Sequence, residues 1–131
     1  MIPAPLRTCT LREPATASAI RDAEHALGCD LPRDHALLLL TSDGLEGPVG
    51  QESYLRIWSV AELPRNNAEY PVKEALKGVT LLGSDGGNTG YGFRRRGDDG
   101  VEYVCVPLIV MDEDEIVVLG TSLETWLRQL R

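Results

Sequence analysis

The chain is expected to fold as a single α+β domain, in which a mainly antiparallel twisted sheet of about five to six strands packs with N-terminal and C-terminal helices. Helix-like apolar spacing near both ends of the 131 residues is one observation behind this prediction. The other is a set of four short runs within residues 79–119 that are rich in β-branched and aromatic residues. Turn signals separate these runs, and short connections favour antiparallel neighbours. A chain of this length buries roughly two-thirds of its unfolded surface in one core, so residues 1–131 are assigned to one domain.

The first half of the sequence predicts two helices and then a strand. Residues 16–27 have the helical apolar period, and Gly28 is suited to close that helix. Pro32 is favoured in the first turn of a second helix, which Asp43-Gly44 would end. A strand is expected over residues 54–60. The predicted buried faces consist of Ala19, Ile20, Ala23 and Leu27 in the first helix, and of Ala36, Leu37 and Leu40 in the second.

The second half predicts a helix, four strands and a closing helix. The helix over residues 66–76 is interrupted or reset at Pro71, because proline removes a backbone donor. The closing helix begins at Thr121, and Glu124 three residues later completes a capping box. Four strands are expected between these helices, at residues 79–82, 89–94, 102–107 and 115–119. The closing helix should lay an apolar stripe on the sheet, formed by Leu123, Trp126, Leu127 and Leu130.

Five glycines lie between two apolar runs in the segment LLGSDGGNTGYGF, residues 81–93. Gly86, Gly87 and Gly90 can reach positive φ, which lets one strand reverse sharply into the next. Two interpretations stay open. A tight hairpin fits the turn chemistry of Gly, Asn and Asp, whereas an anion cradle would use the backbone N–H groups of the same loop. The cradle lacks its usual sequence context, since neither Gly-Lys-Ser/Thr nor a helix-opening G-x-G-x-x-G follows.

The charge balance disfavours several classes of partner. Twenty acidic residues against 13 basic ones give a net charge of −7, which makes nucleic acid a poor partner and a basic protein a better one. Three cysteines without a C-x-x-C predict reduced thiols rather than a disulfide frame or a zinc site. The longest apolar run is too short to cross a bilayer, and the N-terminus does not resemble a signal peptide. We therefore expect a cytoplasmic protein with no membrane partner.

Catalytic patterns are sparse. His25 and His35 fall on predicted helices without cysteines or spaced carboxylates that would complete a metal site. No G-x-S-x-G elbow occurs, and the 85–90 loop lacks the ligand spacing of an EF-hand. We expect no catalytic residue, no metal and no cofactor.

Several segments together resemble one known family. The central motif consists of Gly83, Ser84, Asp85, Gly86 and Gly87, followed by an aromatic strand. Upstream, an acidic-apolar helix leads into a Leu-Gly and then a Leu-Pro step, carried by Ile20, Glu24, Leu27, Gly28, Leu31 and Pro32. Downstream segments match at Leu55, Ile57, Trp58, Glu62, Leu63, Asn67 and Tyr70, and in the closing helix at Ser122, Leu123, Trp126 and Leu127. Over residues 20–127 the chain thus resembles the SUKH superfamily, which groups fungal cell-wall synthesis regulators of the Smi/Knr type with many small bacterial immunity proteins. Asn88 and His35 depart from the family pattern, at positions where a glycine and an aromatic residue are usual.

The resemblance implies a non-enzymatic domain that docks on a cognate bacterial toxin and blocks its active site. A regulatory or scaffolding adaptor of the same fold is the alternative, and a small hydrolase or ligand-binding enzyme that uses the glycine loop is a third hypothesis. Toxins that attack nucleic acid tend to be basic, so an acidic protein can be steered toward them. The candidate partner-binding residues are the loop acids Asp43, Glu46, Glu52, Asp98, Asp99, Asp112, Glu113, Asp114 and Glu115, together with the tyrosines Tyr54, Tyr70 and Tyr91.

Overall fold

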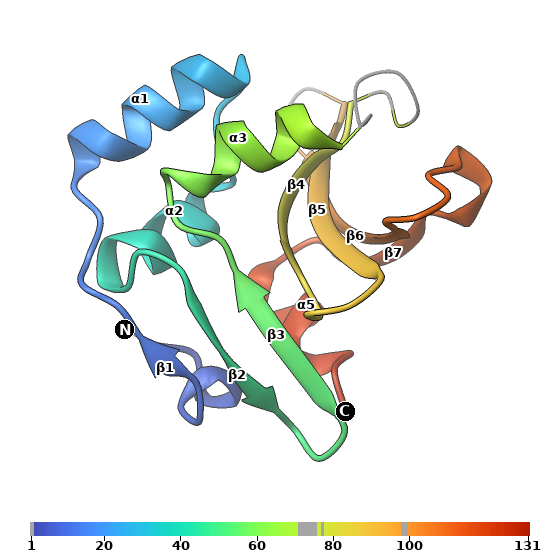
Figure 1. Ribbon diagram of the computed structural model, residues 1–131, viewed down its shortest axis with the longest axis horizontal. Helices are drawn as coiled ribbons and strands as arrows, with labels where there is room; N and C mark the ends of the chain where they lie inside the picture. The colour runs from blue at the N-terminus through green and yellow to red at the C-terminus, as the bar shows by residue number, and fades with distance from the viewer. Residues whose placement is uncertain (1, 71–75, 77, 98–99) are drawn as a thin grey trace.

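The computed structural model describes residues 2–70, 76, 78–97 and 100–131 of the chain. Within these residues, four α-helices and a sheet of seven antiparallel strands form an α+β fold (Figure 1). The predicted fold class is confirmed, although the sheet has more strands than the expected five to six. No helix in the described part of the chain is long and apolar enough to cross a membrane.

The strands cross the sheet in the same order in which they occur in the sequence. They are β1 (Thr10–Leu11), β2 (Leu45–Val49), β3 (Ser53–Ile57), β4 (Thr80–Ser84), β5 (Thr89–Arg96), β6 (Gly100–Pro107) and β7 (Val117–Gly120). Every neighbouring pair is antiparallel. The sheet is therefore a continuous meander with β1 and β7 at its edges.

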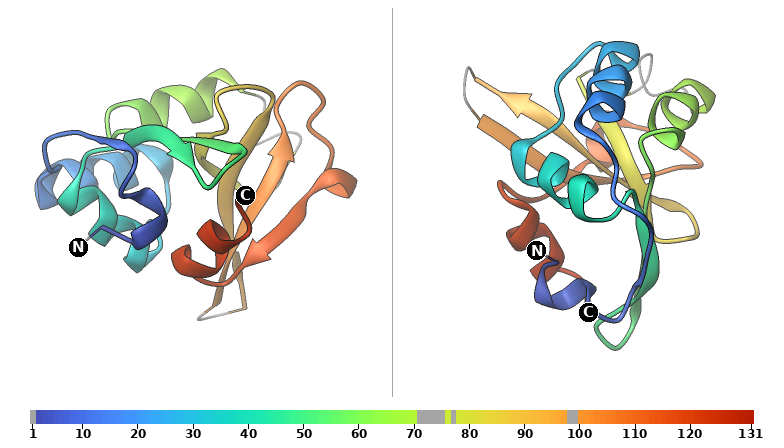
Figure 2. Two further views of the ribbon diagram at one scale, coloured as in Figure 1. Left: turned by 90° about the horizontal axis from the view of Figure 1, so that it is seen from below. Right: turned by 90° about the vertical axis from the view of Figure 1, so that its left-hand side faces the viewer.

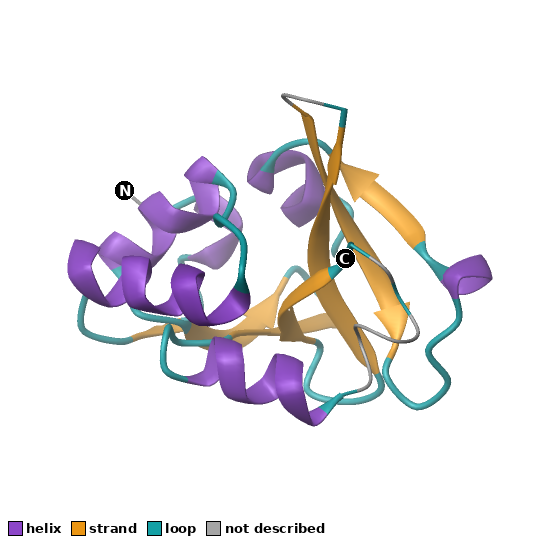
Figure 3. Ribbon diagram, turned by 90° about the horizontal axis from the view of Figure 1, so that it is seen from above, coloured by secondary structure: helices purple, strands orange, loops and turns teal. Residues whose placement is uncertain are grey.

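The helices divide into separate groups around this sheet. Helices α1 (Ala17–Leu27) and α2 (Arg33–Thr41) lie at the end of the molecule away from β6 and β7 (Figure 3). Helix α3 (Glu62–Glu69) packs along β4, whereas α5 (Leu123–Arg128) packs against β6 and β7. Two short 3-10 helices, η1 (Ala4–Leu6) and η2 (Glu113–Glu115), lie near the two ends of the chain.

Strands β1 and β2 were not predicted, because β1 is very short and β2 has the sequence LEGPV. Proline lacks the N–H that a strand interior needs. Here the Pro48 carbonyl accepts a hydrogen bond from Thr8 Oγ1 at 2.8 Å, so the backbone polar groups of Pro48 face away from β3. The missing donor therefore removes no bond from the β2–β3 pairing.

Helix boundaries were predicted best where a cap marks them. Thr16 accepts a hydrogen bond from the Ala19 amide, and Gly28 closes α1 in the left-handed conformation at φ +80°, as expected. Helix α5 instead takes Ser122 as its N-cap, one residue after the predicted Thr121. Helix α3 begins at Glu62 rather than Asn66, and the expected interruption at Pro71 lies outside the described residues.

The buried face of α2 differs from the prediction. His35, Leu38 and Leu39 are buried, whereas Leu37 and Leu40 are 55% and 39% exposed. Four consecutive leucines occupy positions 37–40, so apolar spacing alone cannot select a face there. The prediction was therefore wrong for Leu37 and Leu40, whereas Ala36 is partly buried and packs against the core.

A β-bulge at Leu82 bends the sheet between β3 and β5. Leu81 pairs with Gly92 and Gly83 pairs with Tyr91, so β4 has one extra residue between these pairs. β3 pairs with β4 only at Ser84 and Gly83, and Figure 3 shows the two halves of the sheet meeting at a steep angle. Both Leu81 and Leu82 are fully buried as a result.

At this bulge, the Asn67 side chain provides hydrogen-bond partners that a neighbouring strand would otherwise provide to β4. Its Oδ1 accepts from the Leu81 amide at 2.8 Å, and its Nδ2 donates to the carbonyls of Leu81 at 2.9 Å and Leu63 at 2.8 Å. One amide group thus satisfies both backbone polar groups of Leu81 and fixes α3 on β4.

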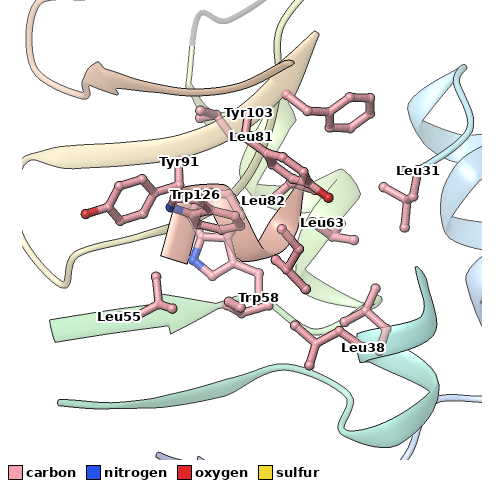
Figure 4. Close-up of a cluster of buried hydrophobic side chains, with 14 of the residues drawn as sticks. Leu31, Leu38, Leu55, Trp58, Leu63, Leu81, Leu82, Tyr91, Tyr103 and Trp126 are labelled. Carbon is pink, nitrogen blue, oxygen red and sulfur yellow. The ribbon is translucent and has the colours of Figure 1, made fainter. Parts of the chain in front are cut away.

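The aromatic core centres on Trp126, which is fully buried as predicted. Its ring stacks on Tyr103 with centroids 5.2 Å apart and meets Tyr91 at 5.3 Å (Figure 4). Trp58 is buried too, at 7% exposure. Asp34 joins three elements around this core, because it accepts from the Tyr103 hydroxyl and from the Leu123 amide, each at 2.6 Å.

Replacing Asn67 with leucine should lower the free energy of unfolding by about 2 kcal/mol or more, because the buried polar groups of Leu81 would lose their partners. Asn66→Leu is the matched control, since the neighbouring Asn66 makes none of these bonds, and it should change stability by about 0.5 kcal/mol at most. Equilibrium denaturation measures both. Equal effects of the two substitutions would contradict the role assigned to Asn67.

His35 should make the fold sensitive to acid. Its side chain is fully buried and neither ring nitrogen has a hydrogen-bond partner. Burial lowers the pKa of His35 from 6.5 to about 4, against the opposing effect of the Asp34 charge. Because the unfolded chain takes up the proton first, stability should fall as the pH drops below 6.5, by about 2 kcal/mol between pH 7 and pH 5.

Denaturation curves at both pH values, compared between the parent and His35→Phe, isolate this contribution from that of other titrating groups. The variant should lose less stability than the parent over this interval. Parallel losses would show that His35 takes no part in acid destabilisation.

Candidate functional site

A polar groove lies between α3 and strands β2 to β4, and we call it the α3 groove. It encloses about 430 Å³. Two predicted partner-binding residues, Glu46 and Tyr70, line it, as do Ser84, Gly86 and Gly87 of the family motif. The fold thus brings together residues that are far apart in the sequence, since Arg12 and Leu108 also line the α3 groove.

The register of the sheet sets the floor of the α3 groove. Glu46 pairs with Arg56 on β3, and Arg56 pairs with Ser84 on β4. These residues share one face of the sheet, since side chains in register across a sheet point the same way. Their neighbours Leu45 and Ile57 are completely or almost completely buried.

Glu46 is the centre of an exposed hydrogen-bond and ion-pair network. Its carboxylate accepts from the Tyr54 hydroxyl at 2.6 Å and from Arg56 Nε at 3.3 Å, with Arg12 at 3.9 Å. The hydrogen bond from Tyr54 and the two arginine charges lower the pKa of Glu46. The same hydrogen bond raises the pKa of Tyr54. At neutral pH the site therefore holds an ionised glutamate already matched by cations.

Glu62 carries a second carboxylate into the α3 groove, at the first turn of α3. It accepts from the Ser59 amide at 3.0 Å and from Arg12 at 3.3 Å. Burial opposes ionisation here, but the hydrogen bonds from Ser59 and the Arg12 charge outweigh it and lower the pKa of Glu62. Arg12 therefore bridges Glu46 and Glu62, and the charges of the groove are largely compensated from within.

The glycine loop has the geometry of a hairpin. Gly86 alone among its glycines takes a positive φ, at +84°. The Asp85 carboxylate accepts from the amides of Gly87 at 2.8 Å and Thr89 at 3.2 Å, and Ser84 Oγ accepts from the Gly86 amide at 3.1 Å. Because side chains of the loop itself occupy these amides, they are not free to cradle an anion.

Gly83 serves a different purpose, which is close approach between strands. A Cβ atom there would lie 2.1 Å from the Arg56 carbonyl oxygen on β3. Gly86 instead lies beneath Tyr54, whose ring would be 3.3 Å from an added Cβ. The motif therefore positions β3 and β4 relative to each other and places the Tyr54 ring over the turn.

The structure separates the remaining candidate residues. Asp43 accepts a hydrogen bond from the Val60 amide at 2.8 Å, which gives it a structural role. Glu52 is exposed in the β2–β3 turn next to the C-terminal residue, since its amide donates to the Arg131 carbonyl at 2.7 Å. Tyr91 is 7% exposed against Trp126 (Figure 4), so it offers little surface to a partner. Asp98 and Asp99 lie outside the described residues.

Asp112, Glu113, Asp114 and Glu115 form a separate feature, which we call the acidic corner. All four are exposed, and they occupy η2 and its N-cap between β6 and β7. Figure 2 shows this segment projecting from the end of the molecule. No ion pair joins these carboxylates to an arginine or lysine of the described chain, in contrast to Glu46, Glu62, Glu102 and Glu124.

Exposed apolar side chains border the acidic corner on both sides. They are Ile109, Val110, Val117 and Val118, with exposed fractions of 75%, 68%, 55% and 46%, and we call them the β7 patch. Sequence reasoning missed this patch because it placed Val117 and Val118 in a predicted strand and gave Ile109 and Val110 no role. The sequence nevertheless contains a signal for exposure. Four consecutive acidic residues separate the two apolar runs and indicate that the adjoining ends of these runs are accessible to solvent.

The described residues show no arrangement suited to metal chemistry. No group of three or more histidine, cysteine or acidic side chains in residues 2–70, 76, 78–97 and 100–131 could hold a metal ion. The three cysteines are free, with Cys9 buried and the other two half-buried. Arg94 and Arg96 pair with the buried Glu102 at 3.0 and 3.2 Å.

Comparison with known protein families gives a match to the SMI1 / KNR4 family (SUKH-1) over residues 14–129. The matched residues include helices α1 and α5, the glycine motif and the acidic corner. Among curated proteins, none matches the chain significantly.

The two neighbouring glycines of the loop should differ in their tolerance of a side chain. Gly86→Ala should cost about 1 to 2 kcal/mol of unfolding free energy, because an L-residue is strained at positive φ. Gly87→Ala should cost clearly less, since Gly87 has no positive φ and its nearest contact would be 3.4 Å away. Thermal or chemical denaturation ranks them. If both variants kept parental stability but bound a partner less well, the loop would be a binding site rather than a turn.

Proposed function

The chain belongs to the SMI1 / KNR4 family (SUKH-1), and on that premise we propose that it is an immunity protein. In this proposal it is a non-enzymatic protein that binds a basic, nuclease-type toxin domain in the cytoplasm. It neutralises the toxin by covering the surface with which the toxin would bind nucleic acid.

The observation that carries the proposal is the uncompensated charge of the acidic corner. A protein that binds phosphates concentrates lysine and arginine on its binding surface. An opposing protein with exposed, unpaired carboxylates is attracted to that surface and accelerates its own association. The acidic corner provides such carboxylates, and the net charge of −7 adds to the attraction at longer range.

The α3 groove fits this role less well. Its two central carboxylates, on Glu46 and Glu62, already face Arg12 and Arg56 at 3.3 to 3.9 Å. Exposed ion pairs of this kind contribute little net field toward a partner. We therefore place the electrostatic attraction at the acidic corner rather than in the groove.

Binding and protection test the proposed function. The gene immediately upstream should encode a large secreted protein with a variable C-terminal domain, and that domain is the probe. Co-expression should protect cells from that domain, and the purified proteins should form a one-to-one complex. Weak binding to several unrelated proteins without protection would instead support the regulatory or scaffolding adaptor.

Neutralising the acidic corner should slow association with that toxin domain by about tenfold at low salt, because exposed charges steer the encounter. The substitutions are Glu113→Gln, Asp114→Asn and Glu115→Gln. Asp112 is kept because its carboxylate accepts from the Asp114 amide at 3.0 Å. The difference should nearly vanish at high salt, where screening acts over a few ångströms. Stopped-flow kinetics across a salt series provides the measurement.

The matched control removes the same charge elsewhere, with Glu13→Gln, Asp22→Asn and Asp30→Asn. These three residues are also exposed. This variant should bind faster than the corner variant at every low salt concentration. Equal rates for the two variants would show that only net charge matters, and rates independent of salt would remove electrostatic attraction from the mechanism.

A further inference from the structure

We propose that the β7 edge, together with the β7 patch, is a docking surface that binds an extended basic segment of a partner as an added strand. The proposal rests on the proposed function in one respect, since it takes the partner to be a basic protein. It goes further by naming the surface, the backbone geometry and the chemistry of the bound segment.

The position of β7 in the sheet provides the first argument. β7 is the last strand of the meander, and it pairs only with β6, through Tyr103, Val104 and Cys105. Within the described residues no strand lies on its outer side. An edge strand exposes unpaired N–H and C=O groups, onto which an extended peptide can add.

The side chains of β7 provide the second argument. Val117 and Val118 are consecutive, so they point to opposite faces of the strand. Both remain about half exposed, and Ile109 and Val110, which are more exposed, lie in the segment that follows β6. A strand added here would make apolar contacts on both of its faces. An edge strand that contacts only solvent would not expose apolar side chains on both faces.

The acidic corner determines which segment fits. Its four carboxylates immediately precede β7, and none pairs with a cation of the described chain. A bound strand that combines lysine or arginine with β-branched residues would match both the charges and the apolar patch. A second copy of this chain would instead bring together two molecules of net charge −7, so a basic partner is favoured over self-association.

The opposite edge of the sheet lacks this combination. β1 contains only Thr10 and Leu11, and the next residue, Arg12, already faces Glu46 and Glu62. Leu11 is nevertheless 49% exposed. It therefore offers a matched control, an exposed apolar residue on the other edge strand.

A peptide titration followed by backbone amide NMR tests the surface without any toxin. The probe is a short, end-capped peptide that alternates lysine and valine, and the comparison peptide alternates glutamate and valine. The lysine peptide should shift amide resonances of residues 109–119, and the glutamate peptide should bind at least about tenfold more weakly, a difference that high salt should reduce. Shifts centred on the α3 groove, or equal binding of both peptides, would overturn the proposal.

The double substitution Val117→Thr and Val118→Thr keeps β-branched side chains but makes the patch polar. It should weaken binding of the lysine peptide by about tenfold or more, whereas Leu11→Thr should leave it unchanged. Sedimentation of the parent chain provides a second measurement. A dimer that dissociates in the double variant would assign the edge to a second copy of the chain and contradict the proposal.

The two proposals fail in different ways. Peptide binding at β7 without protection from the toxin domain would reject immunity and leave the docking surface in place. Full protection by the Val117→Thr, Val118→Thr variant, with unchanged toxin affinity, would reject the docking surface and leave immunity in place.

Discussion

The bend of the sheet at Leu82 is the constraint on which the rest of this structure depends. A regular β4 would continue to pair with β3 and would keep the sheet flatter. Here the pairing is limited to Ser84 and Gly83, followed by one further hydrogen bond from the Trp58 amide to the Leu82 carbonyl at 3.0 Å. A bulge leaves backbone groups without ladder partners, and the Asn67 side chain supplies them at Leu81. The bend therefore needs α3 in place, and α3 in turn forms one wall of the groove that the bend opens.

The bend also separates two surfaces with different electrostatics. On the β1–β3 side, Arg12 and Arg56 lie beside Glu46 and Glu62, so the charges compensate each other. On the β6–β7 side, the acidic corner carries carboxylates without such neighbours and lies among exposed valines and isoleucine. Compensated charge mainly fixes geometry, while uncompensated charge acts on other molecules. This contrast, rather than any pocket, distinguishes the surface we assign to a partner.

Sequence reasoning succeeded where a short stretch of chain determines the outcome. Thr16 and Gly28 mark the ends of α1 through local hydrogen bonds and a left-handed residue, and the Gly86 turn depends only on its own side chains. It failed where distant residues decide. The buried face of α2 depends on what packs against four adjacent leucines, and the orientation of Pro48 depends on Thr8, 40 residues away. The Arg12 bridge to Glu62 spans 50 residues, so no local pattern could have placed it in the groove.

Each interior strand of this meander is held by two neighbours, but β7 is held by one. A substitution in β5 can disturb strand pairing on both of its sides, whereas a substitution in β7 can disturb strand pairing only with β6, apart from its packing against α5. Substitutions can therefore accumulate along this last strand while the registers of the six strands before it are preserved. In the docking mode proposed for β7, such substitutions would change the segment that is bound while the fold of the domain stays the same.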